Sequence, residues 1–302
     1  MLQKIFPALG TVNHITVYGT CSRSVLEDAK RHVLELHQRC SIFDPNSENS
    51  LVNQSAGKRP AAVSEETLSL LVLAQEYASA TNGTFDVTAG AMSRLWKNAI
   101  QLSRVPPQTE IALCKAKCGF QNLRLDRMSG TAFLTQEGMQ IDLGGIAKGY
   151  AADEVRRMLQ EQGVKSAQIN FGGTVVVWGQ QQHIGIQNPF QKTGSPMADL
   201  LVENKAIVTS GVYEQCFFYK GKRLHHMIDP RTGWPSCSGL ISVTLIGDEA
   251  AQLDALATAV CCLGIQEGLP ILQKYGIEAV FVTDDGIVQA TPVLHNQLSF
   301  CA

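Results

Sequence analysis

The sequence lacks the motifs that mark the most familiar nucleotide-binding and hydrolytic sites. It contains neither a Walker GxxxxGK[ST] nor a GxGxxG, so an ordinary P-loop or dinucleotide-fold site is excluded. A GxSxG motif is also absent, which weakens an interpretation as a serine hydrolase. No CxxC occurs, and Cys114 and Cys118, which would lie one turn apart on a helix, have no second ligand pair to complete a zinc site.

A large excess of one charge and long apolar runs are missing too. The formal net charge is −2, and no basic stripe offsets a phosphate backbone, so we expect no nucleic-acid partner. The longest apolar runs, such as residues 255–263, are far shorter than the roughly 20 residues that span a bilayer. The N-terminus has neither the apolar core of a signal peptide nor an early cysteine for lipidation. Nine cysteines, an odd number, fit reduced thiols, and we expect a cytoplasmic protein without membrane insertion.

Two amphipathic helices can be predicted from hydrophobic periodicity. A chain of 302 residues that is 45% hydrophobic can bury a full-sized core. Residues 24–40 are expected to form one helix, with Ser24 and Glu27 as a capping box. Residues 65–80 are expected to form another. The apolar face of the first helix consists of Leu26, Ala29, Val33, Leu36 and Cys40.

Short strands separated by turn residues dominate the middle and the C-terminal part. The predicted strands are residues 131–135, 139–142, 167–171, 175–178, 183–187, 216–219, 224–228, 279–283 and 287–290. Helices and hairpins occur in clusters rather than in βαβ alternation, which indicates an α+β fold. We expect one domain over residues 1–302, built from two interleaved subdomains with mixed or antiparallel sheets and packed helices.

Residues 141–153 contain a candidate phosphate site. Residues 141–143 are expected to end a strand, Gly144 and Gly145 to form a turn, and Ile146 to lead into a helix. The start of a helix carries unpaired N–H groups and the positive end of the helix dipole. Lys148 would add a positive charge there. The element suits a phosphate or pyrophosphate, although a glycine turn before a helix is more often purely structural.

Asp254 and Thr258 form a second candidate site. Residues 248–263 are expected to be helical, so this i, i+4 pair lies on one face. A carboxylate and a hydroxyl are oxygen ligands that suit a hard cation such as Mg²⁺. The alternative is that Thr258 only donates to a backbone carbonyl of its own helix.

His225 and His226 form a third candidate, because histidine transfers protons near neutral pH. On a strand the two side chains would point to opposite faces, so only one can face a cleft, and the other would be solvent-facing or half-buried. The residues 229–233, Asp-Pro-Arg-Thr-Gly, are typical of a turn.

Taken in order, these motifs resemble the ApbE family of FAD:protein FMN transferases. The resemblance covers about residues 8–290. It depends on eight motifs, namely Gly10-Thr11, residues 44–48, residues 83–86, residues 142–151, residues 170–173, residues 209–211, residues 226–233 and residues 254–258. The family often has Met and Tyr where this chain has Leu9 and Phe43, both of which could still pack on a flavin.

The resemblance implies an α+β fold that binds FAD as a substrate, with Mg²⁺ at the pyrophosphate. It implies that Asp254, Thr258 and the Gly145 carbonyl hold the metal, and that His226 is the catalytic histidine. It further implies that the FAD site is lined by Thr84, Phe85, Asp86, Asp142, Lys148 and His226.

The implied reaction is transfer of FMN from FAD to a Ser or Thr of an acceptor flavoprotein, with release of AMP. One alternative is an FAD pyrophosphatase, in which water replaces the acceptor hydroxyl and FMN and AMP are released. An alternative of another class is a flavin-binding protein without catalysis. The presence of His226 with Asp254 and Thr258 argues against the last, because binding alone needs no base beside a metal.

Overall fold

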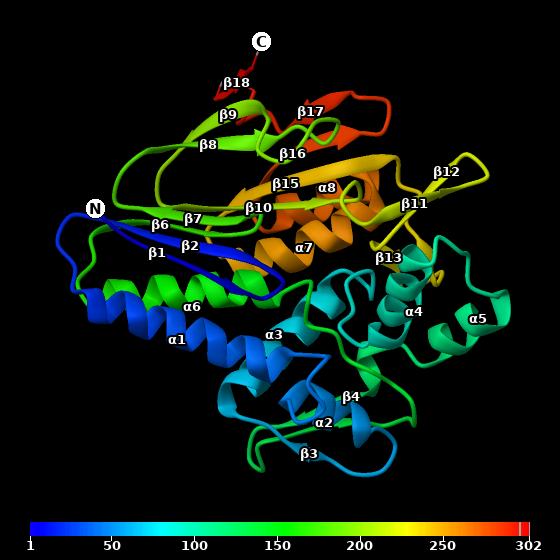
Figure 1. Cartoon of the computed structure of the whole chain (residues 1–302). Coiled ribbons are helices and arrows are strands. Elements are labelled where there is room, and N and C mark those ends of the chain that lie inside the picture. Colours follow the sequence, from blue (N-terminus) through cyan, green and yellow to red (C-terminus); the bar gives the residue numbers. More distant parts are fainter. Residues whose placement is uncertain (296, 302) are drawn as a thin grey trace. The chain divides into compact units, whose positions relative to one another are not determined.

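The computed structural model describes residues 1–295 and 297–301. Two compact units are present, each made of segments that are separate in the sequence. Unit 1 comprises Met1–Leu36, Ile146–Tyr213 and Gly239–Ala302, and unit 2 comprises His37–Gly145 and Glu214–Ser238. Helices and antiparallel sheets occur in clusters, so the fold class is α+β, as predicted (Figure 1). The assignment of residues 1–302 to one domain stays a prediction, and its last residue, 302, lies outside the described residues.

Unit 1 is built on an eight-stranded sheet with the order β1-β2-β6-β7-β10-β15-β16-β17. Every neighbouring pair in this sheet is antiparallel. The predicted strands 167–171, 175–178, 279–283 and 287–290 are all confirmed within it. Its strands are β1 (Leu2–Ala8), β2 (Thr11–Tyr18), β6 (Ser166–Phe171), β7 (Thr174–Trp178), β10 (Lys205–Gly211), β15 (Leu240–Gly247), β16 (Glu278–Thr283) and β17 (Val288–Ala290).

The large sheet is covered on both faces. On one face lies a three-stranded sheet of β8 (Gln182–Gln187), β9 (Pro196–Val202) and β18 (Leu298–Phe300). Apolar side chains of the two sheets form a common core that includes Val175, Ile184 and Ile207. The helices α6 (Ala147–Glu161), α7 (Ala250–Leu263) and α8 (Ile265–Lys274) pack on the other side of unit 1. Every residue of β15 is therefore buried, as expected for a strand covered on both faces.

The helices α6 and α7 approach each other closely at Gly149. A Cβ atom at this position would lie 2.2 Å from the carbonyl oxygen of Ala250, so only glycine fits without moving the helices apart. Helix α7 is buried along nearly its whole length, which explains the apolar run at residues 255–263. Within the described part of the chain, no helix is long and apolar enough to cross a membrane.

Unit 2 contains several helices and three small sheets. A buried cluster with Met92, Trp96 and Ile228 holds it together, and the Trp96 Nε1–H donates to the Gly233 carbonyl at 2.9 Å. Its helices are α2 (Glu48–Gln54), α3 (Glu65–Ala80), α4 (Gly90–Gln101), α5 (Gln108–Ala116) and the 3₁₀ turn η1 (Phe120–Asn122). Its strands are β3 (Ala61–Ala62), β4 (Leu123–Asp126), β5 (Thr131–Leu134), β11 (Cys216–Tyr219), β12 (Lys222–His225), β13 (Ile228–Asp229) and β14 (Trp234–Pro235).

The two predicted helices are confirmed, but the predicted capping box is wrong. The first helix, α1, spans Arg23–Cys40, and α3 has the predicted bounds. Ser24 lies inside α1, and its N–H donates to the Ser22 hydroxyl at 3.3 Å, so Ser22 caps the helix instead. Glu27 forms an ion pair with Lys4 of β1 and is not available to a capping box.

The predicted strand at residues 139–142 is also wrong. The Ile141 N–H donates to the Asn53 side chain at 2.7 Å, and the Ile141 carbonyl accepts from Asn49 and Asn53. The Asp142 N–H donates to the Val87 carbonyl at 2.8 Å. Side chains of α2 thus take the backbone bonds that a neighbouring strand would make, and the apolar alternation reflects burial without a sheet.

Candidate functional site

The predicted helix start after Gly144 and Gly145 is confirmed, since α6 begins at Ala147 with Ile146 as its cap. Ile146 provides no side-chain hydrogen bond to the cap. The Gly149 N–H in the first turn donates instead to the Asp254 Oδ2 of α7 at 3.0 Å. The Lys148 Nζ lies 3.3 Å from the other oxygen of that carboxylate. The start of α6 therefore already holds an anionic group with one N–H and one ammonium.

Asp254 and Thr258 lie on one face of α7, as predicted. The Asp254 side chain is buried and the Thr258 hydroxyl donates to the Asp254 carbonyl at 3.2 Å. This bond is the alternative that the sequence left open, and it is compatible with metal binding. The hydroxyl uses its proton in the bond, so its oxygen keeps lone pairs for a cation. A buried carboxylate and a hydroxyl one turn apart are a donor set that fits a hard divalent cation.

Gly145, the third expected metal ligand, belongs to unit 2, whereas Asp254 and Thr258 belong to unit 1. Its role stays a prediction. Of the residues expected to line the FAD site, only Lys148 lies in unit 1.

In unit 2, the residues Thr84, Phe85 and Asp86 follow α3 and are all buried. The Thr84 hydroxyl has no hydrogen-bond partner, although buried hydroxyls normally have one. An orphaned buried hydroxyl is compatible with a polar ligand such as FAD beside this segment.

The Asp86 carboxylate, by contrast, is fully engaged within unit 2. It accepts from the Thr88 N–H and hydroxyl, from the Phe120 N–H at 2.8 Å and from the Cys118 thiol at 3.6 Å. Burial raises the pKa of Asp86, and it raises the pKa of the Cys118 thiol to about 12. Asp86 therefore fixes the loop before η1, and Cys118 is a donor in this network.

Asp142 has a partner that sequence reasoning missed. The Lys97 Nζ of α4 lies 2.9 Å from its Oδ2, while its Oδ1 accepts the Gly144 N–H at 2.9 Å. The two side chains are 45 positions apart, so no motif spacing relates them. No sequence pattern therefore links Lys97 to Asp142.

The two histidines differ from the prediction. His225 ends β12 and is buried, with 5% of its surface exposed, rather than solvent-facing or half-buried. His226 does not belong to the strand, because the predicted strand 224–228 breaks after His225: the pairing of β12 with β11 ends at His225, and Ile228 pairs instead with β14. Burial lowers the pKa of His225 to about 4, so its ring is neutral.

His226 is partly exposed and has a defined backbone contact. Its Nδ1 lies 3.4 Å from the Gln215 carbonyl oxygen at the base of β11. A carbonyl can only accept, so a bond here places the proton on Nδ1 and leaves Nε2 as the acceptor nitrogen of the ring. This tautomer suits a general base.

Comparison with known proteins places this geometry in a family. The model of the ApbE family matches residues 9–281. The chain belongs to the ApbE family.

Curated relatives and solved structures agree with the assignment. A protein of Klebsiella pneumoniae (strain 342) named FAD:protein FMN transferase is 36% identical over 243 residues, which are 80% of this chain and 77% of that protein. A protein of the same name from Treponema pallidum is 29% identical over 94% of this chain and 84% of its own length. The crystal structure of the ApbE protein of Thermotoga maritima superposes with a TM-score of 0.89 at 28% identity, covering 98% of each chain. The flavin transferase ApbE of Vibrio cholerae gives a TM-score of 0.83 at 26% identity, covering 98% of this chain and 99% of that one.

Proposed function

We propose that this protein transfers the FMN part of FAD to a Ser or Thr hydroxyl of an acceptor flavoprotein and releases AMP. The acceptor oxygen forms a bond to the FMN phosphorus, the pyrophosphate P–O bond breaks, and AMP leaves with the electron pair of that bond. Membership of a family whose relatives are named FAD:protein FMN transferase supports this reaction. The observation in this chain that carries it is the Asp254 carboxylate held at the start of α6 by Gly149 and Lys148.

The start of α6 and the adjoining face of α7 would bind the pyrophosphate. Lys148 is a compact positive charge in the first helical turn, where the helix dipole also favours phosphate oxygens. Asp254 and Thr258, with the Gly145 carbonyl, would hold Mg²⁺, which when bound supplies positive charge to the pyrophosphate oxygens. Asp142 and the segment Thr84 to Asp86 would bind the rest of FAD.

His226 would take the proton of the acceptor hydroxyl. Its Nδ1 faces the Gln215 carbonyl, which orients the ring and presents Nε2 to the substrate. His225 cannot share this role, because it is buried and its pKa is lowered to about 4.

We also propose the cytoplasm as the compartment of this reaction. All nine cysteines are free thiols in the structure, two of them vicinal and buried at Cys261 and Cys262. A protein rich in unpaired thiols suits a reducing compartment.

The test is incubation with FAD, Mg²⁺ and candidate flavoproteins, followed by mass spectrometry of protein and small molecules. Transfer adds one FMN, less one water, to a Ser or Thr of the acceptor and releases AMP. Free FMN and AMP in equal amounts without a modified acceptor would identify a pyrophosphatase. Intact FAD in every mixture would contradict the proposal.

A further inference from the structure

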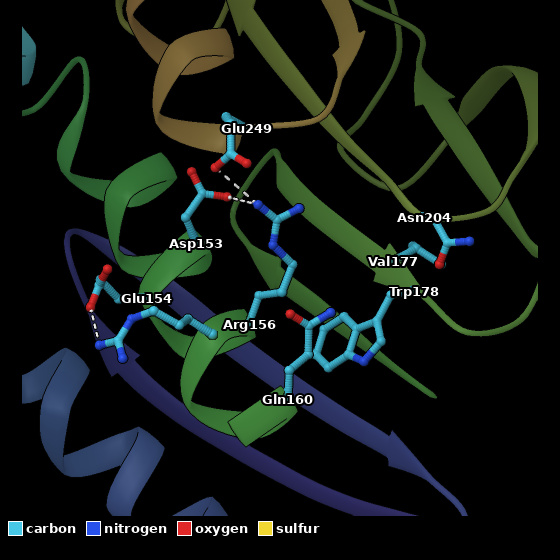
Figure 2. A pocket seen from close by; sticks show the side chains of 9 residues that line it. Asp153, Glu154, Arg156, Gln160, Val177, Trp178, Asn204 and Glu249 are labelled. Carbon is cyan, nitrogen blue, oxygen red and sulfur yellow. Dashed lines mark hydrogen bonds and ion pairs between the residues drawn. The ribbon is translucent and has the colours of Figure 1, made fainter. Parts of the chain in front are cut away.

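A polar cluster joins α6 to the start of α7 on the surface of unit 1. Figure 2 shows Asp153 and Arg156 of α6 directed toward Glu249, which precedes α7, in a surface pocket. The side chains of Asp153 and Arg156 are only 14% and 18% exposed, whereas the Glu249 side chain is 61% exposed.

Asp153 caps α7 from outside that helix. Its Oδ1 accepts the Ala250 N–H at 3.0 Å and its Oδ2 accepts the Ala251 N–H at 2.8 Å. Glu249, the residue at the cap position, makes no side-chain hydrogen bond to the helix. The first N–H groups of α7, which would otherwise lack partners, thus bind a carboxylate of α6.

Arg156 strengthens the same junction. Its guanidinium donates to Asp153 Oδ1 at 3.0 Å, to the Asp248 carbonyl at 2.7 Å and to Glu249 Oε2 at 3.0 Å. Arg156 therefore orients the Asp153 carboxylate and also binds Asp248 and Glu249, the two residues that precede α7.

Two contacts fix the register of α6 against α7. Gly149 binds Asp254, and four residues later on α6 Asp153 binds Ala250 and Ala251, about four residues earlier on α7. The helices are thus pinned at two points about one turn apart, in antiparallel directions. Without the Asp153 bonds, the position of the Asp254 carboxylate relative to Lys148 would depend on that one hydrogen bond and on helix packing, including the close approach of Gly149 to Ala250.

We propose that Asp153 is a positioning residue for the metal site, because it holds α7 in register so that the Asp254 carboxylate faces Lys148 and a divalent cation. This inference rests on the proposed function for the metal role of Asp254. The Asp153 carboxylate binds the first N–H groups of α7 to α6, and the Asp254 carboxylate keeps lone pairs for the cation. Residues that orient a metal ligand typically change metal affinity by about 10- to 100-fold when they are replaced.

The chain provides a matched control. Glu154, the next residue of α6, lines the same pocket, and its carboxylate pairs with Arg157 of its own helix at 2.7 Å. Asp153→Asn and Glu154→Gln each remove one negative charge from one helix. Only the first removes a carboxylate that binds the start of α7.

The experiment is titration of the full-length protein with Mn²⁺ alone, with the signal of free Mn²⁺ followed by electron paramagnetic resonance. Asp254→Asn defines binding outside the site. We expect Asp153→Asn to raise the Kd for Mn²⁺ by about 10- to 100-fold, and Glu154→Gln to leave it within about twofold of wild type. Arg156→Gln keeps Asp153, so we expect it to raise the Kd for Mn²⁺ less than Asp153→Asn does. It is the second variant to measure if Asp153→Asn folds poorly.

The outcomes separate two failures. Equal Mn²⁺ affinity in folded Asp153→Asn and Glu154→Gln would overturn the positioning role. If Asp153→Asn does not fold, equal affinity in Arg156→Gln and wild type would overturn it. Equal affinity in wild type and Asp254→Asn would overturn the metal assignment itself, and with it this inference. A lower melting temperature without a change in Kd would leave Asp153 a stabilising residue only.

Discussion

The backbone N–H of Gly149 in α6 donates to the side chain of Asp254 in α7 at 3.0 Å, although 105 positions separate them in the chain. This bond can form only because a Cβ at position 149 is absent where α7 begins. It brings the ammonium of Lys148 to the same carboxylate. A helix start that favours anions and a candidate metal ligand therefore meet within unit 1.

Replacement of Asp254 should abolish metal-dependent turnover. Asp254→Asn keeps an acceptor for the Gly149 N–H but removes the negative charge that would hold the divalent cation. We expect the rate of FMN transfer to fall by at least about 100-fold, because a bound cation typically stabilises the transition state by several kcal/mol. Circular dichroism should show a folded protein. Wild-type rates in this variant, or in wild-type enzyme with excess EDTA, would contradict the assignment.

Replacement of His226 should separate chemistry from binding. His226→Ala should lower the transfer rate by about 10²- to 10⁴-fold, the usual scale for a positioned acid–base group. The affinity for FAD, measured by flavin fluorescence, should change far less. An equal loss of rate and affinity would show that His226 mainly binds FAD.

His225 should affect stability rather than proton transfer, in a pH-dependent manner. Its pKa is lowered to about 4 in the folded state, against about 6.5 unfolded, so the unfolded chain binds the proton more readily. The contribution of neutral His225 to the free energy of unfolding is therefore complete above pH 6.5. It is lost as the pH falls toward 4, which lowers the free energy of unfolding by up to about 3 kcal/mol.

Urea unfolding near neutral pH and at mildly acidic pH measures this effect. His225→Gln should unfold more easily than wild type at neutral pH, and its stability should fall less on acidification. Parallel pH profiles for the two proteins would argue against a neutral buried ring.

Lys97 should matter for FAD binding through Asp142. The ion pair is partly exposed, so its loss in Lys97→Ala should weaken FAD binding by no more than about fivefold. Lys205→Ala is a suitable control, because Lys205 forms an exposed pair with Asp248 in unit 1 at 2.7 Å. Identical FAD affinities for both variants and wild type would remove Lys97 from the site.

Gly149→Ala should destabilise the protein by forcing α6 away from α7. Overpacking of this kind typically costs about 1–3 kcal/mol, which should appear as a lower melting temperature. Gly144→Ala is the control, since its added methyl would meet only the Asp142 side chain, at 3.1 Å. A stable Gly149→Ala protein with unchanged Mn²⁺ affinity would show that the helices adjust without effect on Asp254.

Local features could be predicted from the sequence, and long-range partners could not. The pair Asp254 and Thr258 is set by helical periodicity, which the sequence displays directly. The hydrogen bond between the Ala250 N–H and Asp153 depends on how α6 and α7 cross, and the spacing of residues in the sequence does not predict that crossing. The ion pair of Lys97 and Asp142 likewise joins residues far apart in the sequence, so no motif predicts it.

The errors have local physical causes. The apolar alternation at residues 139–142 reflects the burial of Met139 and Ile141. The Asn53 side chain makes the backbone hydrogen bonds of Ile141 that a neighbouring strand would otherwise make. The two histidines were assigned to one strand, but the chain bends after His225 and the alternation of faces no longer applies. Polar side chains that bond to backbone are the common reason why strand patterns mislead.

The pairing of β2 with β6 has a cost during synthesis. Tyr18 and Gln168 share a hydrogen bond in the finished protein but are 150 positions apart. At typical elongation rates, roughly 8–30 s pass between their appearance on the ribosome. Throughout that interval the hairpin of β1 and β2 has no partner strand, and unpaired strand edges readily join other chains. The nascent protein is therefore expected to depend on chaperones that bind the hairpin of β1 and β2 until β6 emerges, and slow translation should lower its yield.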